Sequence, residues 1–159
     1  MTGYSRRSSP RLSHYDYRQE AHYFVTVCTR DHVCRLGRIR EGIMCLSDAG
    51  ALVAESWLAL PEAVPDLHLD AWVVMPNHFH GIVALHAVES ERSHDLSALV
   101  GRFKAVSARA INHHDGRQGE PVWQRSFYDH VVRNETDLER IREYVANNPA
   151  RWSDDRFYR

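Results

Sequence analysis

The pattern of hydrophobic and polar positions predicts strands and helices that alternate along the chain. Segments rich in aromatic and β-branched residues, or with alternating polarity, predict strands at 22–29, 67–75, 78–85 and 122–133, and a short hairpin within 33–46. Apolar stripes with helical spacing predict helices at 47–60, 95–112 and 137–148. Because strand 22–29 is apolar on both faces, we expect it to be central in its sheet.

The order of these elements is that of an α+β fold with a ferredoxin-like split βαβ arrangement. This fold has an antiparallel sheet with helices packed on one face. The other face is left for a ligand, and the last helix, 137–148, can close over it. The chain is therefore divided into an arm (1–20), one domain (21–152) and a tail (153–159).

Length and composition fit one globular domain. The chain has 159 residues, of which 43% are hydrophobic and 26% are charged. No apolar run approaches the roughly 18 residues of a membrane span, and the arginine-rich start lacks the apolar core of a signal peptide. We therefore expect a cytoplasmic protein without membrane contacts. The three cysteines form no C-x-x-C pair, so we expect no disulfide framework.

Charge is spread unevenly, although the net charge is only -1. Residues 1–40 are strongly basic and residues 41–95 strongly acidic, which favours an anionic partner for the arm and the C-terminal half. The arm interleaves Arg6, Arg7 and Arg11 with tyrosines. This composition suits contacts with phosphates and stacked bases, and equally suits a solvated tail.

His78 and His80 are the first candidates for chemistry. Residues two apart on a strand point to the same side, with Cα atoms about 6.5 Å apart. Both imidazoles can therefore reach one metal ion, while Phe79 faces the opposite side. The chain contains eleven histidines, so a His-x-His pair can also arise by chance.

A tyrosine is the candidate nucleophile beside such an ion. Two imidazoles and an asparagine amide suit a divalent cation that keeps positions open for phosphate oxygens. The phenol of tyrosine has an ordinary pKa of about 10, and a nearby cation makes its phenolate accessible. Tyr144 is favoured because Asn148 lies one helical turn further on the same face. Tyr128, near His130, is the competing tyrosine.

Three motifs in this order closely resemble those of the REP-associated tyrosine transposases, which are single-tyrosine HUH endonucleases (His, hydrophobic residue, His). The motifs are Met75-Pro-Asn-His-Phe-His80, Trp123-Gln-Arg-Ser-Phe-Tyr-Asp-His130, and Tyr144-Val-Ala-Asn-Asn-Pro149 with Trp152. The likeness extends from about Arg6 to Trp152. It implies a ferredoxin-like HUH transposase domain over 21–152, an added C-terminal helix that carries the tyrosine, and a Mg²⁺ or Mn²⁺ ion.

The resemblance also implies roles for particular residues. His78 and His80 match the metal ligands, Tyr144 the nucleophile and Asn148 a third ligand. The expected contacts with DNA involve the arm and two later regions: Arg6, Arg7, Arg11, Arg102, Lys104, Arg125, Tyr128 and His130.

The function implied is cleavage and rejoining of single-stranded DNA with palindromic hairpins, through a 5′-phosphotyrosine and a free 3′-hydroxyl, by a monomer or a homodimer. One alternative is a domesticated protein that binds repeat hairpins without cutting them. Retention of Tyr144 and all three ligands favours the enzyme. An RNA-binding module shares this topology, but strand 22–29 lacks the aromatic motif typical of such modules.

Overall fold

The fold is built on a four-stranded antiparallel sheet. The computed structural model describes residues 21–85 and 95–159, so the predicted arm with Arg6, Arg7 and Arg11 lies outside the described residues. The sheet has the order β4-β5-β1-β6, with β1 (Ala21–Cys28), β4 (Leu67–Met75), β5 (His78–Leu85) and β6 (Tyr128–Val131). A separate hairpin consists of β2 (Gly37–Arg40) and β3 (Ile43–Leu46).

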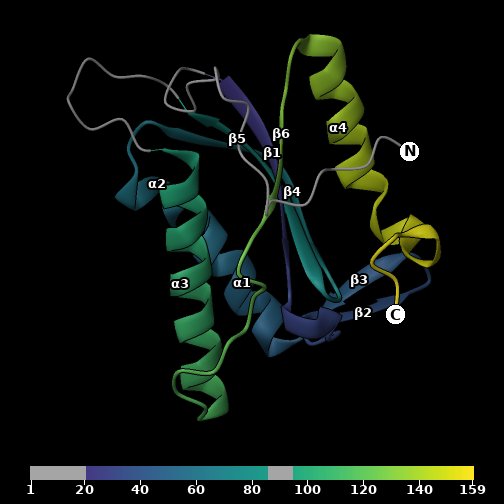
Figure 1. The fold of residues 1–159 in the computed structure, drawn as a ribbon. Helices are drawn as coiled ribbons and strands as arrows, with labels where there is room; N and C mark the ends of the chain where they lie inside the picture. The colour runs from purple at the N-terminus through teal and green to yellow at the C-terminus, as the bar shows by residue number, and fades with distance from the viewer. Residues whose placement is uncertain (1–20, 86–94) are drawn as a thin grey trace.

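Helices cover both faces of this sheet. Helices α1 (Asp48–Leu58) and α3 (Leu96–Asp115) lie on one side and α4 (Glu135–Asn147) lies on the other (Figure 1). The short elements are α2 (Leu60–Ala63) and the 3₁₀ turns η1 (Arg30–His32) and η2 (Pro149–Asp154). The predicted α+β, ferredoxin-like fold is confirmed, with β1 and β5 as the central strands. Within the described ranges, no helix has both the length and the apolar character needed to cross a membrane.

Several predicted element boundaries differ from those observed. Helix α4, predicted over 137–148, begins two residues earlier, at Glu135, and ends at Asn147. Helix α1 ends at Leu58 and not at residue 60, and the short helix α2 begins at Leu60 with Pro61 in its first turn, where proline is tolerated. Helix α3 continues to Asp115, where Gly116 ends it with a φ of 68°. The predicted strand 122–133 is regular only over β6, because the carbonyls of Gln124 and Ser126 accept from the Lys104 ammonium instead.

Alternation along the central strands creates two cores of different size. Val25, Val27 and Phe79 face α1 and α3 and belong to the main core, together with large side chains of these helices: Val53, Trp57, Leu99, Phe103 and Ile111. On the opposite face, Phe24 and Ile82 meet Ile141 and Val145 of α4 in a much smaller cluster. The main core therefore carries most of the buried apolar surface, and the smaller one positions α4.

Polar contacts fix α4 across the width of the sheet. The side chain of Asn134 caps the helix by accepting from the backbone N–H of Asp137. Arg142 donates from Nε and Nη2 to the two carboxylate oxygens of Asp70 on β4, at 2.9 and 2.6 Å. His130 of β6 donates from Nε2 to Asp137 at 2.8 Å. Since β4 and β6 are the outer strands, α4 is attached at both edges.

Replacing Gly81 tests the packing between β5 and α1. A Cβ atom at Gly81 would lie 2.5 Å from Cζ2 of Trp57, whereas one at Gly101 of α3 would meet nothing within 4 Å. We expect Gly81→Ala to lower the free energy of unfolding by about 1–3 kcal/mol through overpacking. Gly101→Ala, the control, should raise it slightly, since alanine favours helices. Urea unfolding measures both, and equal effects would contradict this packing.

The Asp137 contacts predict a specific dependence of stability on pH. Burial disfavours the charged carboxylate, but hydrogen bonds from Arg140 and His130 outweigh this and lower the pKa of Asp137 to about 2. A lowered pKa contributes stability above the unfolded-state pKa of about 4, and this contribution is lost as the pH falls towards 2. The stability difference between the unaltered protein and Asp137→Asn should therefore shrink as the pH falls from about 5 to about 3. Urea unfolding across this range measures the difference, with Glu143→Gln, an exposed site on the same helix, as the control.

Candidate active site

His78 and His80 lie at the start of β5 and point towards the face covered by α4. The register of the sheet places Cys28 opposite His78 and Thr26 opposite His80. Both imidazoles are almost completely buried, and their ring centroids lie 4.6 Å apart. Phe79 points the other way, where its ring meets Trp57 at 4.6 Å. The strand therefore separates two chemically different neighbourhoods.

The Nδ1 atom of each imidazole is held by a neighbouring polar group. The Nδ2 amide of Asn77 donates to the carbonyls of His32 and Phe157, which turns its Oδ1 towards Nδ1 of His78 at 2.9 Å. Because this oxygen can only accept, Nδ1 of His78 carries the proton and Nε2 carries a lone pair. The Thr26 hydroxyl lies 2.7 Å from Nδ1 of His80 and can accept in the same way. Asn77, which the sequence marks only as a turn residue, thus orients the first histidine.

Buried polar atoms without hydrogen-bond partners converge beside these rings. They are Nε2 of His78, Nε2 of His80 and Oδ1 of Asn148. A carboxylate oxygen of Asp155 lies 3.6 Å from Nε2 of His78, and the ligand atoms of His78, His80 and Asp155 all lie within 4.8 Å of one another. Leaving a buried polar atom unpaired costs about 1–3 kcal/mol. Two imidazole nitrogens and nearby side-chain oxygens form a donor set that fits a divalent cation.

Asp155 was missed by the sequence analysis, which placed it in the tail. It follows the last segment with a recognisable hydrophobic period. The only signal in the sequence was therefore its carboxylate side chain, a type that can bind a metal ion. Its side chain is 3% exposed. Two residues further, Phe157 is buried against Cys28 and Tyr128, which holds this C-terminal segment against the sheet.

Burial keeps both histidines of this donor set neutral. It lowers the pKa of His78 well below the ordinary value and lowers the pKa of His80 to about 3. Both rings are therefore neutral near pH 7, with lone pairs available to a cation. Burial also raises the pKa of the Asp155 carboxyl, a cost that a bound cation would offset.

Tyr144 and Asn148 lie one turn apart on α4 and its C-cap, next to the histidines. The Tyr144 ring is 5.5 Å from that of His80 and 6.1 Å from that of Phe24, in edge-on contact with the latter. It is 38% exposed, whereas Asn148 is 3% exposed. Burial raises the pKa of the Tyr144 phenol, so the free phenol stays protonated near neutral pH. One chain thus brings together a partly accessible tyrosine and a buried donor set.

The residues expected to contact DNA differ in their exposure and in the face of the sheet on which they lie. Tyr128 is 8% exposed and packs against Phe157, and His130 is hydrogen-bonded to Asp137. Lys104 donates to two carbonyls of the 124–126 segment. Arg102 and Arg125 are exposed. Arg102 and Lys104 lie on α3, across the sheet from α4 (Figure 1).

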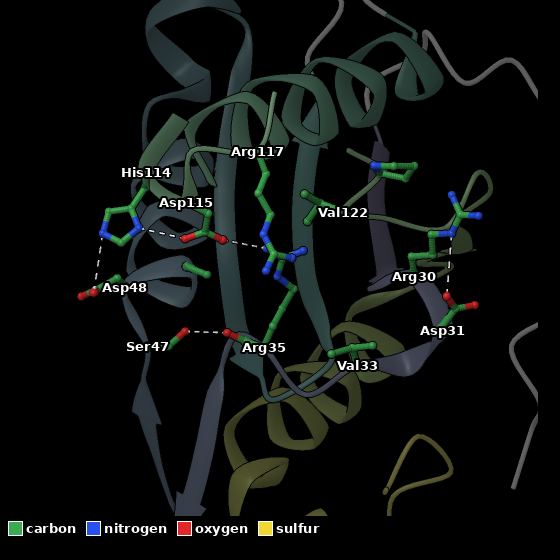
Figure 2. A pocket seen from close by; sticks show the side chains of 12 residues that line it. Arg30, Asp31, Val33, Arg35, Ser47, Asp48, His114, Asp115, Arg117 and Val122 are labelled. Carbon is green, nitrogen blue, oxygen red and sulfur yellow. Dashed lines mark hydrogen bonds and ion pairs between the residues drawn. The ribbon is translucent and has the colours of Figure 1, made fainter. Parts of the chain in front are cut away.

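A cavity of about 700 Å³ lies apart from the histidines, with walls from the β1–β2 connection, the start of α1 and the end of α3 (Figure 2). Its charged groups are paired within the protein: Arg35 donates to Asp115 at 2.9 Å, and His114 lies 3.6 Å from Asp48. Among the predicted site residues that fall within 21–85 and 95–159, none lines it. The chemistry suggested by the sequence therefore belongs to the face under α4.

Comparisons with known proteins agree with this arrangement. The family described as "Transposase IS200 like" matches residues 63–148. An uncharacterized protein of Haemophilus influenzae is 34% identical over 174 residues, which cover 98% of this chain and 95% of the relative. A REP-associated tyrosine transposase of Escherichia coli K12 is 30% identical over 83 residues, which cover 52% of this chain and 44% of the relative.

Solved structures show the same fold. A structure described as a REP-associated tyrosine transposase bound to a REP hairpin matches with a TM-score of 0.65 and 22% identity, covering 89% of this chain and 74% of that one. A putative transposase from Deinococcus radiodurans matches with a TM-score of 0.54 and 19% identity, covering 87% and 97%. The resemblance found in the motifs is confirmed, and the chain belongs to the IS200-like transposase family, with REP-associated tyrosine transposases among its relatives.

Proposed function

We propose that this protein is a metal-dependent endonuclease that cleaves and rejoins single-stranded, hairpin-forming DNA through a covalent bond to Tyr144. Family membership supports a transposase-like function and DNA binding in general. The observation that carries the finer proposal is the position of the Tyr144 ring beside buried imidazoles whose Nε2 atoms have no hydrogen-bond partner. The candidate nucleophile and the candidate cation ligands lie together on one face of one chain, so the proposed site needs no residue from a second molecule.

The donor set supports a role for Mg²⁺ or Mn²⁺. His78 and His80 would hold the ion, with Asn148 and Asp155 as the oxygen donors. A divalent ion bound there supplies positive charge that polarises a phosphate group. The protein itself contributes neutral imidazoles, fixed through Asn77 and Thr26.

The reaction exchanges one phosphoester for another. The phenolic oxygen of Tyr144 forms a bond to phosphorus, and the bond between phosphorus and the 3′ oxygen breaks. The phenol gives up its proton and the departing 3′ oxygen takes one up, which leaves a 5′-phosphotyrosine and a 3′-hydroxyl. Since no phosphoester is lost, attack by a 3′-hydroxyl reverses the step and rejoins DNA without ATP.

A second candidate is a protein that binds repeat hairpins without cutting them. The REP-associated transposase structure with a similar fold is described as bound to a REP hairpin, which suits either function. Binding alone gives no reason to bury two imidazole nitrogens and an amide oxygen without partners, at a cost of about 1–3 kcal/mol each. These atoms favour the enzyme.

Covalent capture of DNA tests the proposal. Labelled single-stranded hairpins from repeats near the gene are incubated with the protein and Mn²⁺ or EDTA, and a denaturing gel detects the protein–DNA adduct. We expect an adduct that requires Mn²⁺, is abolished in Tyr144→Phe and His80→Ala, and persists in Tyr128→Phe. If the adduct were lost only in Tyr128→Phe, the assignment of Tyr144 as the nucleophile would be wrong. Tight binding with no adduct in Mn²⁺ or Mg²⁺ would favour the non-cutting protein.

The two oxygen donors can be tested separately by titration with Mn²⁺ in a calorimeter. If both bind the ion, Asn148→Ala and Asp155→Asn should each weaken Mn²⁺ binding by about tenfold or more. Asp154→Asn, an exposed acid one position earlier, is the matched control for lost charge and should leave the affinity nearly unchanged. Unchanged affinity in Asp155→Asn would remove Asp155 from the ligand set.

A further inference from the structure

Arg156 is fixed beside the candidate site by both of its neighbours in sequence. Asp155 on one side belongs to the donor set. On the other side, the carbonyl of Phe157 accepts from the Asn77 amide at 2.7 Å, and the Phe157 ring lies 4.7 Å from that of His78. The backbone that carries Arg156 is therefore attached to the same groups that orient the first histidine.

The guanidinium of Arg156 lies against two aromatic rings. Its Cζ atom is 4.8 Å from the centroid of Tyr128 and 4.6 Å from that of Phe157. Such cation–π contacts hold the charged group in place while the residue itself remains exposed. Tyr128, expected to face DNA, thus forms part of a platform for an arginine.

The sheet brings this platform close to the histidines. Tyr128, Thr26 and His80 are direct cross-strand neighbours in one row, on the face that carries the donor set. Two strand spacings separate Tyr128 from His80, which amounts to about 10 Å. The Phe157 ring, the other part of the platform, lies 4.7 Å from the His78 ring, and the Tyr144 ring lies 5.5 Å from the His80 ring. The guanidinium is therefore held on the same face as the histidines and Tyr144.

A cation in this position opposes the binding of a metal ion to the histidines, because like charges repel. The arrangement becomes favourable when an anion binds between the two positive charges. We propose that Arg156, held on Tyr128 and Phe157, binds the phosphate group that Tyr144 attacks. This rests on the proposed function and adds a residue that touches the substrate.

Chemistry supports a guanidinium for this role. Its planar N–H groups can donate to two non-bridging oxygens of a phosphodiester at once. Negative charge on these oxygens increases while the tyrosine bond forms and the bond to the 3′ oxygen breaks. A preorganised cation therefore stabilises the transition state more than the ground state.

Binding measurements test the proposal without turnover. In a Tyr144→Phe background with EDTA, Arg156→Gln should weaken binding to a hairpin with a single-stranded extension, and reduce the slope of log K against log salt by about 0.7, the value for one phosphate contact in single strands. In the absence of DNA, Arg156→Gln should bind Mn²⁺ more tightly than the unaltered protein, since a repulsive charge has been removed. A merely structural role for Arg156 would not tighten Mn²⁺ binding.

The rate of adduct formation provides the second readout. We expect Arg156→Gln to form the Tyr144 adduct about 100-fold more slowly, and Arg156→Lys to retain the salt slope but only part of the rate. Arg159→Ala, an exposed arginine of the same segment, is the control and should match the unaltered protein.

The outcomes separate this proposal from the proposed function. Normal adduct formation and an unchanged salt slope in Arg156→Gln would overturn the role of Arg156 and leave the function standing. Absence of any adduct with the unaltered protein would overturn the function, and with it the assignment of an attacked phosphate.

Discussion

Two neutral imidazoles buried between a sheet and a helix need a partner for each ring nitrogen, and this requirement organises the site. Asn77 and Thr26 satisfy the Nδ1 atoms, which leaves the Nε2 atoms for the donor set that includes Asn148 and Asp155. The Asn77 side chain is held in this orientation because its amide donates to the carbonyl of His32 and, in the C-terminal segment, to that of Phe157. Elements distant in sequence are thus linked through the orientation of one histidine.

One face of the sheet carries most of the packing that stabilises the fold, and the other carries the candidate site. The main core joins the sheet to α1 and α3 and contains most of the large buried side chains. The face under α4 has only a small apolar cluster, and polar contacts at both sheet edges complete its attachment. Polar and titratable groups can therefore be buried beneath α4 without interrupting the packing that holds the fold together.

Local patterns in the sequence were sufficient for much of this arrangement. Alternation along 78–85 predicted that the two histidines share a face, and helical spacing predicted that Tyr144 and Asn148 lie one turn apart. Contacts between segments that are distant in the sequence leave no local pattern from which they could be predicted. Lys104 binds carbonyls twenty residues away and shortens the predicted strand, while Asp155 reaches the histidines from a segment without hydrophobic periodicity. The position of Asp155 beside the histidines, in addition to the predicted Asn148, thus depended on tertiary structure alone.

The attachment of α4 also has a consequence for stoichiometry. Helix α4 follows β6 after a short connection and is bound to the sheet of its own chain, so each molecule carries one Tyr144 beside one pair of histidines. If Tyr144 is the nucleophile, as proposed above, a molecule holds one DNA end covalently at any time. Moving a segment requires cuts at two ends, so the two cuts must be made either in succession by one molecule or together by two.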